Sequence, residues 1–448
     1  MVLATIIGLA VSMPAWAELL SFASAADRLS LAPTQRAAES RVSQAQSQFE
    51  AASGLRLPTV GLAAQAVRTQ DPIEVDFAPL NAMLKELLPG AIPLPNPVLQ
   101  EDFFAVAETT LRWPLFTGGR ITAAREAAQL GATAAQWGTT VANDGLFAQL
   151  LMRYYAVTVA QQAVDVQEQL LDGLRLHDRN ARALYENDQI SRTERIAAEV
   201  ALAQGEQSLS SRKHALSLAQ SALANLLSLT SPPDPTTELT VPRLEESLVA
   251  LQAAAEASNP GLKQLGSLRA QAEQGIQAAK GEYLPTVELV GVYRVASHQL
   301  PELLPRWVAG VNISVPVFDG GIRRSRVGEA RAKLSEAGAL HDRASQELRL
   351  LVEQRYLAYQ DAIARIEVSD RTITLTDDSL RSERLAFTEG VGRSADVVDA
   401  ENAAAGAKLE RLAARYEAAV AYGTLMLAAG HREQAENYFR NAPSRPSP

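Results

Sequence analysis

The sequence has no cysteine, and only 5% of its 448 residues are aromatic. The absence of cysteine excludes disulfides, zinc–thiolate sites, cysteine nucleophiles and lipids attached to a cysteine, so we expect no lipid anchor. Few aromatic side chains and many alanines predict helices that pack closely through small residues, without a bulky core. The net charge of -9 argues against a nucleic-acid partner, because nothing neutralises a phosphate backbone.

Patterns for catalysis and metal binding are also lacking. The five histidines are scattered without the spacing of metal ligands: His177, His214, His298, His341 and His431. The segment Gly118-Gly119-Arg120 precedes a helix, as in some anion sites, but no Walker lysine follows. The sequence therefore predicts a protein that is not an enzyme and that has no cofactor and no metal site.

The N-terminus has the pattern of an export signal. Residues 3–11 form a short apolar run, and Ala15-Trp16-Ala17 before Glu18 matches the small-x-small site that signal peptidase cuts. We expect residues 1–17 to be a signal peptide; a buried apolar helix is the alternative. No later run reaches 18 apolar residues, so the sequence predicts no membrane-spanning helix.

The chain repeats itself once. Residues 51–62 (AASGLRLPTVGL) and 278–289 (AAKGEYLPTVEL) share eight of twelve positions at an offset of 227. Residues 114–119 (PLFTGG) match 316–321 (PVFDGG) at an offset of 202, so the first copy carries 25 additional residues. These fall in the proline-rich stretch 71–100, where we expect a long loop. Two copies of one unit predict a pseudo-twofold architecture.

Each copy contains two segments in which apolar and polar residues alternate, as in half-buried strands. We expect strands at about 57–69, 103–115, 285–296 and 306–317. Strands of about ten residues with an apolar outer face suit a transmembrane β-barrel. Four strands are too few to close a barrel, so this interpretation requires an oligomer. An antiparallel sheet on a soluble domain is the alternative.

Two proline-free stretches, 121–187 and 322–389, predict unusually long helices of about 100 Å each. The second contains small and apolar residues at spacings of four and three, as in a coiled-coil seam: Ala330, Leu334, Ala337, His341, Ala344, Leu348 and Leu351. The pattern breaks near 187–191 and 389–393, where Ser191 and Ser394 are candidate N-caps of returning helices. Each long helix therefore turns back at a tip.

The expected fold class is α+β and mostly α, with two repeats of helix, strand, strand, long helix and helix. The expected organisation is a first repeat at 18–230 with a helical hairpin at 119–230, a linker and short helix at 231–257, a second repeat at 258–430 with a hairpin at 321–430, and a C-terminal tail at 431–448.

These motifs carry a family resemblance. The duplicated L-P-x-V segments, the P-x-F-x-G-G turns before long helices and residues 190–194 (ISRTE) resemble the TolC-type outer membrane efflux channels, over about residues 20–430. The resemblance implies a homotrimer in which each chain gives four strands to one twelve-stranded barrel in outer membrane lipid, continued by an α-helical tunnel across the periplasm. It also implies a periplasmic adaptor, or membrane fusion protein, and an inner-membrane pump as partners.

The strand-to-helix turns form the first set of candidate residues, because glycine accommodates unusual dihedrals and proline tolerates a lost backbone donor there. They are Pro114, Gly118, Gly119, Pro316, Gly320 and Gly321. The second set is Asp396 and Asp399, in a segment similar to the one that forms stacked aspartate rings in the family's founding member. The two lie on one helix face and would make rings of three carboxylates in a trimer, which attract cations. A solvated acidic face is the alternative.

The family's closed state is held by a tyrosine and an arginine that bond to an acidic group on the neighbouring hairpin. Here Glu194 takes the acidic place, Phe387 replaces the tyrosine, and Gly392 stands at the arginine position, with Arg393 one residue later. We therefore expect a closed state that is weaker or is held by different contacts. The resemblance places adaptor docking at the two tips, on Asp188, Gln189, Ile190, Ser191, Gly390, Val391 and Gly392.

The functional hypothesis is the exit duct of a tripartite efflux or type I secretion system, through which substrates pass passively. The alternative is a periplasmic coiled-coil adaptor or scaffold of a transport complex, but such an adaptor normally has one long hairpin. The substrate and the class of pump stay open, because similar channels serve multidrug efflux, metal-ion export and protein secretion.

Overall fold

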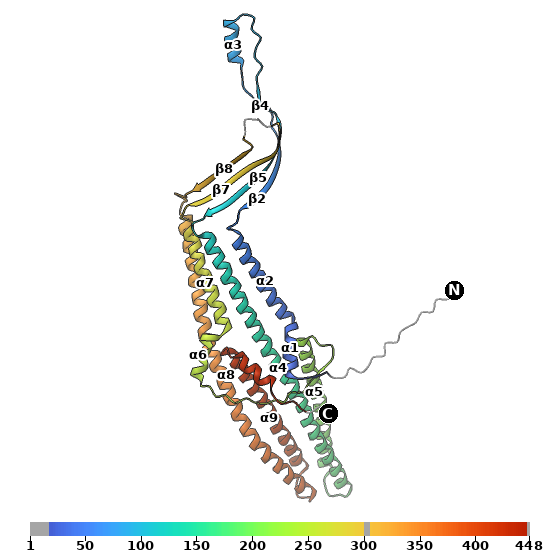
Figure 1. Ribbon diagram of the computed structural model, residues 1–448. Coiled ribbons are helices and arrows are strands. Elements are labelled where there is room, and N and C mark those ends of the chain that lie inside the picture. Colours follow the sequence, from blue (N-terminus) through green and yellow to red (C-terminus); the bar gives the residue numbers. More distant parts are fainter. Residues whose placement is uncertain (1–17, 300–304, 446–448) are drawn as a thin grey trace, which may run out of the picture. The chain divides into compact units, whose positions relative to one another are not determined.

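The structure, a computed structural model, describes residues 18–299 and 305–445, so the signal peptide expected at 1–17 lies outside the described residues. The chain is mostly helical, with one four-stranded sheet (Figure 1). It divides into two compact units. The helical unit comprises the described parts of Met1–Val42, Ala134–Gly266 and Leu340–Pro448; the sheet unit comprises Ser43–Thr133 and the described parts of Ser267–Ala339.

The helices include three pairs of nearly equal length. Helices α2 and α7 have 22 residues each, α4 and α8 have 67 each, and α5 and α9 have 36 and 35. None of the helices in the described part of the chain combines the length and apolar character needed to span a bilayer. The bounds are α1 Phe22–Arg28, α2 Pro33–Gly54, α3 Ala78–Leu87, α4 Arg120–Glu186, α5 Arg192–Leu227, α6 Leu248–Ser258, α7 Pro260–Gly281, α8 Ile322–Thr388, α9 Ser394–Ala428 and α10 Arg432–Arg440.

The main sheet is antiparallel, with strand order β2-β5-β7-β8. Both outer strands, β2 and β8, have an edge without a partner strand among the described residues. Strand β8 ends three residues earlier than expected, ahead of Pro316, which lacks the N–H group that a ladder needs. The bounds are β1 Glu18–Leu20, β2 Thr59–Arg68, β3 Ile73–Glu74, β4 Val98–Gln100, β5 Phe103–Phe116, β6 Pro233–Pro235, β7 Thr286–His298 and β8 Trp307–Ser314.

The register of the sheet collects apolar side chains from all four strands on one face, since side chains alternate between faces along a strand. Leu62 pairs with Thr109, Thr109 with Tyr293, and Tyr293 with Trp307. The neighbouring rows are Val60, Leu111, Gly291 and Ala309, and Trp113, Leu289 and Val311. The opposite face carries polar pairs: Arg294 with Glu108 at 3.7 Å, and Asn312 with Glu288 at 3.2 Å. The apolar face is exposed, at 74% for Leu62 and 67% for Trp307.

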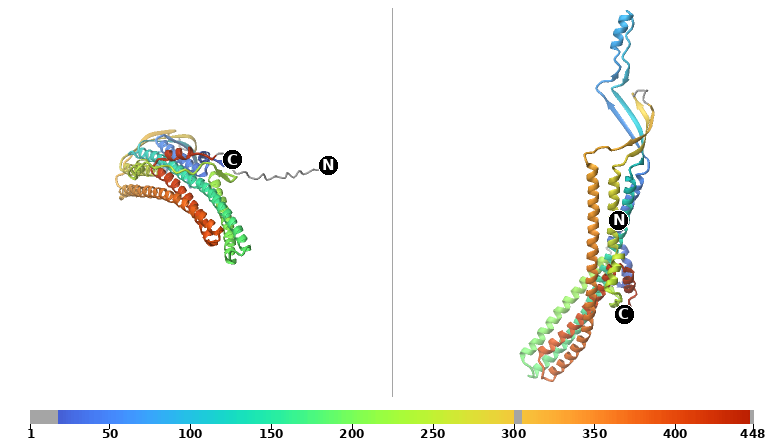
Figure 2. Two further views of the ribbon diagram at one scale, coloured as in Figure 1. Left: turned by 90° about the horizontal axis from the view of Figure 1, so that it is seen from below. Right: turned by 90° about the vertical axis from the view of Figure 1, so that its left-hand side faces the viewer.

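The expected loop at 71–100 is partly helical, which corrects the sequence prediction. It contains the short strands β3 and β4 and the ten-residue helix α3 (Figures 1 and 2). Pro79 lies in the first turn of α3, where a helix loses no hydrogen bond to proline. The side chain of Asn81 then pairs with both backbone groups of Leu94, each at 2.8 Å. Proline therefore starts this helix and does not break it.

The helical unit has an aromatic core, which corrects the expectation of a chain without bulky packing. Phe22 stacks on Tyr155 with ring centroids 5.9 Å apart, and Phe439 lies 5.7 Å from Phe22. The Tyr154 hydroxyl donates to the carbonyl of Leu20 at 2.7 Å. Few aromatic residues suffice because several of them, including Phe22, Tyr154, Tyr155 and Phe439, gather at one place.

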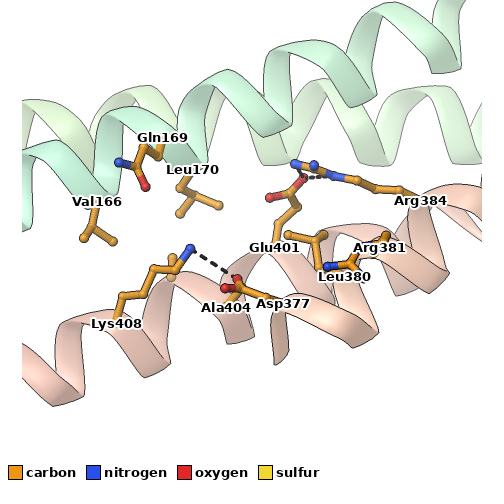
Figure 3. A pocket seen from close by; sticks show the side chains of 11 residues that line it. Val166, Gln169, Leu170, Asp377, Leu380, Arg381, Arg384, Glu401, Ala404 and Lys408 are labelled. Atoms are coloured by element: carbon orange, nitrogen blue, oxygen red, sulfur yellow. Dashed lines mark hydrogen bonds and ion pairs between the residues drawn. The ribbon is translucent and has the colours of Figure 1, made fainter. Parts of the chain in front are cut away.

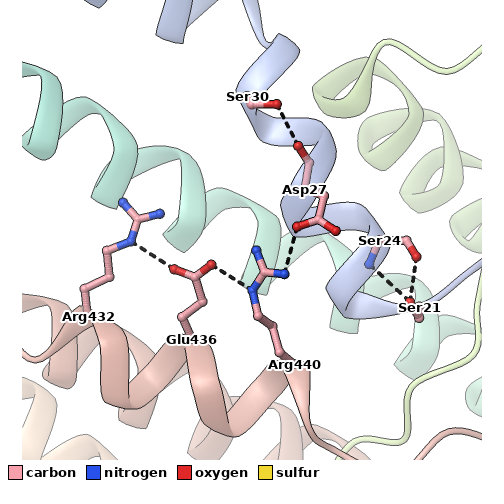
Figure 4. Close-up of polar contacts among 7 residues, drawn as sticks. All are labelled: Ser21, Ser24, Asp27, Ser30, Arg432, Glu436 and Arg440. Carbon is pink, nitrogen blue, oxygen red and sulfur yellow. Dashed lines mark hydrogen bonds and ion pairs between the residues drawn. The ribbon is translucent and has the colours of Figure 1, made fainter.

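The segment expected as a C-terminal tail contains helix α10, which delivers Phe439 to this core. Figure 4 shows Arg440 of α10 bonded both to Asp27 of α1 and to Glu436 one turn earlier, each at 2.8 Å. Strand β1 pairs in parallel with β6. The two ends of the described chain are thus tied into one core.

Small side chains form the helix contacts, as the alanine content predicts. The buried face of α9 consists largely of alanines: Ala400, Ala404, Ala405, Ala407, Ala414, Ala418, Ala419, Ala421 and Ala428. One detail of the predicted seam on α8 is wrong, because Leu351 is 38% exposed whereas Val352 is fully buried. A straight helix drifts relative to a strict seven-residue repeat, which moves the buried position by one residue.

Candidate functional site at the two helical tips

The two tips are built by the same turn. In the first, Asp188 N donates to Tyr185 O and Gln189 N to Leu184 O. In the second, Gly390 N donates to Phe387 O and Val391 N to Ala386 O, at the offset of 202 seen in the sequence. This is a Schellman motif, whose central residue adopts a left-handed conformation. Asp188 and Gly390 have φ of 56° and 76°.

The returning helices begin differently. Ser191 caps α5 as expected: its Oγ accepts from Glu194 N at 3.2 Å, and Glu194 Oε2 accepts from Ser191 N at 3.1 Å. Ser394 does not cap α9, because Arg393 is the N-cap and Ser394 is the first helical residue. Around the two turns Asp188, Gln189 and Val391 are exposed, with Val391 at 82%.

The expected constriction residues lie at the start of α9. Asp396 accepts two hydrogen bonds from Arg393, at 2.7 and 3.0 Å. The hydrogen bond from Arg393 is the main cause that lowers the pKa of Asp396 below its usual value. Asp399 is exposed one turn further along the helix.

The three lock candidates do not form one lock within the chain. Glu194 caps its own helix and Arg393 bonds to Asp396. Glu194 adds only a small electrostatic contribution to the raised pKa of Arg393, which its hydrogen bond to Asp396 dominates. Phe387 is buried at 2% exposure, and its ring centroid lies 4.6 Å from that of His177.

A buried polar contact instead links the two hairpins near their tips. His177 of α4 and Ser394 of α9 lie 2.7 Å apart between Nε2 and Oγ, and both are buried. Burial is the main cause that lowers the pKa of His177, so its neutral form is favoured. Four helices contribute one residue each to the apolar cluster beside this contact: Ala181, Ala198, Phe387 and Val397.

A second buried polar group lies further from the tip. Glu401 of α9, 4% exposed, accepts from Arg384 Nε of α8 at 2.8 Å. A Cβ on Gly173 of α4 would lie 2.6 Å from the Glu401 carboxylate, so glycine leaves the room that this pair occupies. Figure 3 shows the pair at the wall of a cavity of about 360 Å³, beside the ion pair of Lys408 and Asp377. Burial raises the pKa of Glu401, and Arg384 opposes that shift.

The glycines of the strand-to-helix turns all have positive φ: Gly118 at 64°, Gly119 at 80°, Gly320 at 67° and Gly321 at 90°. Gly118 is also tightly packed, since a Cβ there would lie 2.3 Å from the carbonyl oxygen of Gly281. Pro114 lies inside β5, next to a shift in the register with β7. Pro316 lies between β8 and α8, and its carbonyl accepts from Arg323 at 2.6 Å.

The residues that sequence reasoning missed are His177, Gly173 and Arg384. The sequence offered one usable signal: Glu401 matches Glu199 in the first copy at the offset of 202. Glu199 pairs with Arg195 on its own helix and is exposed, so the two copies use this position differently. Among the described residues no group of three or more acidic or histidine side chains is placed to hold a metal ion.

Paired long hairpins and an open four-stranded sheet with one apolar face characterise the described part of this chain. Comparison with known proteins shows which family it resembles. Residues 251–431 match the family described as Outer membrane efflux protein. The resemblance to TolC-type channels that the duplicated motifs indicate is thereby confirmed.

Individual proteins show the same likeness. Protein CyaE of Bordetella pertussis is 28% identical over 314 residues, which cover 66% of this chain and 64% of that protein. The outer membrane protein VceC of Vibrio cholerae has 17% identity and a TM-score of 0.73, covering 91% of this chain and 96% of its own. The open-state MtrE outer membrane channel of Neisseria gonorrhoeae has 18% identity and a TM-score of 0.74, covering 92% and 89%.

Proposed function

We propose that this chain is the subunit of a homotrimeric outer membrane channel, the exit duct of an efflux or secretion system. In this proposal three four-stranded sheets close into one twelve-stranded barrel in the outer membrane. The long hairpins form a periplasmic tunnel, the chain follows a two-repeat plan, and residues 1–17 are removed after export. The channel has no catalytic role, and substrates move through it passively.

The observation that carries the proposal is the exposed apolar face of the sheet, in register across all four strands. A bilayer is the solvent that stabilises such a face, because lipid tails bury it without competing for polar groups. The second argument is that the outer edges of β2 and β8 have no partner strand within residues 18–299 and 305–445. Backbone donors and acceptors at those edges need partners inside a membrane, and neighbouring copies provide them when the barrel closes.

The tips support the gating part of the proposal. Asp399, exposed on the face shared with Asp396, would give a ring of three carboxylates in a trimer. The contact between His177 and Ser394 holds the two hairpins together and takes the place of the lock expected from Glu194, Phe387 and Arg393. Opening the tip would require breaking this contact.

The partners follow from the exposed turns. The segments 188–191 and 390–392 present exposed side chains such as Gln189 and Val391 at the ends of the hairpins, where a periplasmic adaptor would dock and connect the channel to an inner-membrane pump. A coiled-coil adaptor is the competing function. This alternative does not explain the four-stranded sheet, because a protein in the aqueous periplasm would leave its continuous apolar face exposed to water.

The test compares lysine substitutions at adjacent positions of β8. Val311 lies on the apolar face and Asn312 on the polar face. A lysine at the bilayer midplane destabilises a barrel by about 2–4 kcal/mol, whereas a lysine toward the lumen stays hydrated. We expect Val311→Lys to reduce the heat-resistant trimer recovered from outer membranes, and Asn312→Lys to leave it intact. A wild-type chain that is monomeric and absent from the membrane fraction would exclude the channel.

A further inference from the structure

Helix α3 presents an apolar stripe that no described part of the chain covers. Leu80, Met83 and Leu87 are 39%, 53% and 69% exposed. Their spacing of three and four residues puts them on one side of the helix, the spacing with which helices pack against each other. Lys85 and Glu86 lie on other sides of α3, so the stripe carries no charge.

Hydrogen bonds within the loop that contains α3 keep the stripe exposed. Asn81 bonds to the backbone of Leu94 on both sides of its amide, and Leu84 is half-buried beside it. The Asp76 carboxylate accepts from Ala78 N at 2.7 Å, and Asn96 accepts from Phe77 N at 2.9 Å. These contacts fix the rotation of α3, so the face with Leu80, Met83 and Leu87 turns away from its own chain.

Charge argues against a lipid surface as the occupant of this stripe. Helices that lie on membranes carry lysine and arginine on their polar side and bind anionic lipids. Residues 71–102 have Lys85 as their single basic residue, against six acidic ones: Asp71, Glu74, Asp76, Glu86, Glu101 and Asp102. An anionic surface would repel this segment. Between copies of the chain the repulsion is weaker, because the acidic side chains lie off the stripe and remain in water, where salt screens them.

The position of α3 in the sheet unit indicates a second copy of the chain as the occupant. The segment that carries α3 joins the end of β2 to the start of β5, and β2 is an edge strand of the sheet (Figure 1). In the trimer proposed above, β2 pairs with a neighbouring chain. Since α3 follows β2 along the chain, it lies next to this interface between two copies. A twelve-stranded barrel has a radius of about 12 Å. Helices packed about 8–10 Å apart around its axis therefore need an inward lean of only several ångströms.

We propose that the three α3 helices of a trimer pack together through Leu80, Met83 and Leu87. This helix cluster lies at the end of the sheet opposite to α2 and α4, because the segment joins the strand ends away from those helices. The conducting path would then leave the trimer beside the cluster, between the three segments that join α3 to the sheets. The inference rests on the proposed trimer, and the test separates the two.

The chain has no cysteine, so single cysteines can be crosslinked without background. Leu80→Cys, Met83→Cys and Leu87→Cys are introduced separately, with Lys85→Cys on the far side of the same helix as the matched control. The purified proteins are oxidised in detergent and resolved without reductant, and the assembly mass of each is measured before oxidation. We expect disulfide-linked dimers at stripe positions, up to about two thirds of the chains, because a threefold ring leaves one thiol unpaired. Lys85→Cys should stay uncrosslinked.

Trimers in which none of the three stripe positions crosslinks would overturn the helix cluster and leave the channel proposal standing. Equal crosslinking of Lys85→Cys would also overturn it, since it would reflect random collision. A polarity-sensitive dye attached to the thiol of Met83→Cys that reports apolar surroundings only in lipid vesicles, without dimers, would assign the stripe to the membrane. A monomeric mass would instead reject the trimer itself.

Discussion

Two acidic side chains on α9 are held in opposite ways. Asp396 is bonded to Arg393 at the surface, which lowers its pKa and keeps it charged. Glu401 is buried, which raises its pKa although Arg384 is bonded to it. A carboxylate that lines a pore must stay ionised and accessible to solvent and ions. A carboxylate buried between packed helices is stable only when it is paired with a cation. This contrast supports the proposal that Asp396, with Asp399, lines the pore, and it fits a structural role for Glu401 in the hairpin.

The first prediction concerns ion selectivity. Asp396→Asn/Asp399→Asn removes two carboxylates per chain and keeps their shape, so the preference of the channel for cations should fall several-fold. The measurement is the reversal potential under a salt gradient in a planar bilayer. Asp165→Ala/Glu206→Ala, which removes the same charge from the first hairpin away from the tip, is the control and should keep the wild-type preference. Unchanged selectivity in the tip variant would move the constriction elsewhere.

The second prediction concerns pH. Burial lowers the pKa of His177, so its contact with Ser394 contributes stability above the unfolded value of about 6.5 and loses it as the pH falls through the folded value. Among its charged neighbours, Asp178 opposes this shift and Arg384 adds to it. Glu401 titrates with the opposite sign: its raised pKa adds stability at low pH that is lost as the pH rises.

Hydrogen exchange of the tip amides should therefore speed up as the pH falls below about 6.5, after correction for the intrinsic rate. His177→Gln keeps a polar side chain and cannot be protonated, so in this variant the acid-induced increase should disappear. The same increase in both proteins would show that another group controls the tip.

At the scale of elements, turns determine where strands become helices and where helices return. Gly118 and Gly119 both have positive φ, but only Gly118 lies against the backbone of Gly281. Gly119→Ala should destabilise the trimer by about 1–2 kcal/mol, the cost of a left-handed residue with a side chain. Gly118→Ala should cost clearly more, because it also displaces backbone.

Both glycine variants are compared by the heat stability of the trimer, measured as the temperature at which its slow-migrating band is lost. Equal midpoints for Gly118→Ala and Gly119→Ala would mean that dihedral strain alone sets the requirement for glycine at this turn.

The sequence predicted elements well where a local pattern decides them. Glycine pairs mark the turns that follow β5 and β8, at Gly118-Gly119 and Gly320-Gly321, and unbroken periodicity marks the long helices. Helix α3 was missed because three prolines in its return segment, Pro93, Pro95 and Pro97, masked the helix. It is held by Asn81, which bonds to the backbone of Leu94 thirteen residues later. The contact between His177 and Ser394 could not be predicted, since 217 residues separate the two and neither has a pattern of its own.

At the scale of the whole molecule, the chain is incomplete alone. Its sheet has two open edges and an uncovered apolar face among the described residues, and α3 has an uncovered stripe. The proposed trimer would satisfy each of these surfaces, with neighbouring copies over the edges and the stripe and lipid over the face. The open edges and the exposed face of the sheet, which are separate observations, are the strongest physical argument for the trimer.

The central claim is that three chains enclose one conducting path, and single-channel conductance of the purified trimer in a planar bilayer tests it most directly. A trimer that encloses such a path should give discrete cation-selective current steps. The steps should be larger in His177→Ala/Ser394→Ala, which removes the contact between the hairpins. A folded, membrane-inserted trimer that carries no current in either form would contradict the claim.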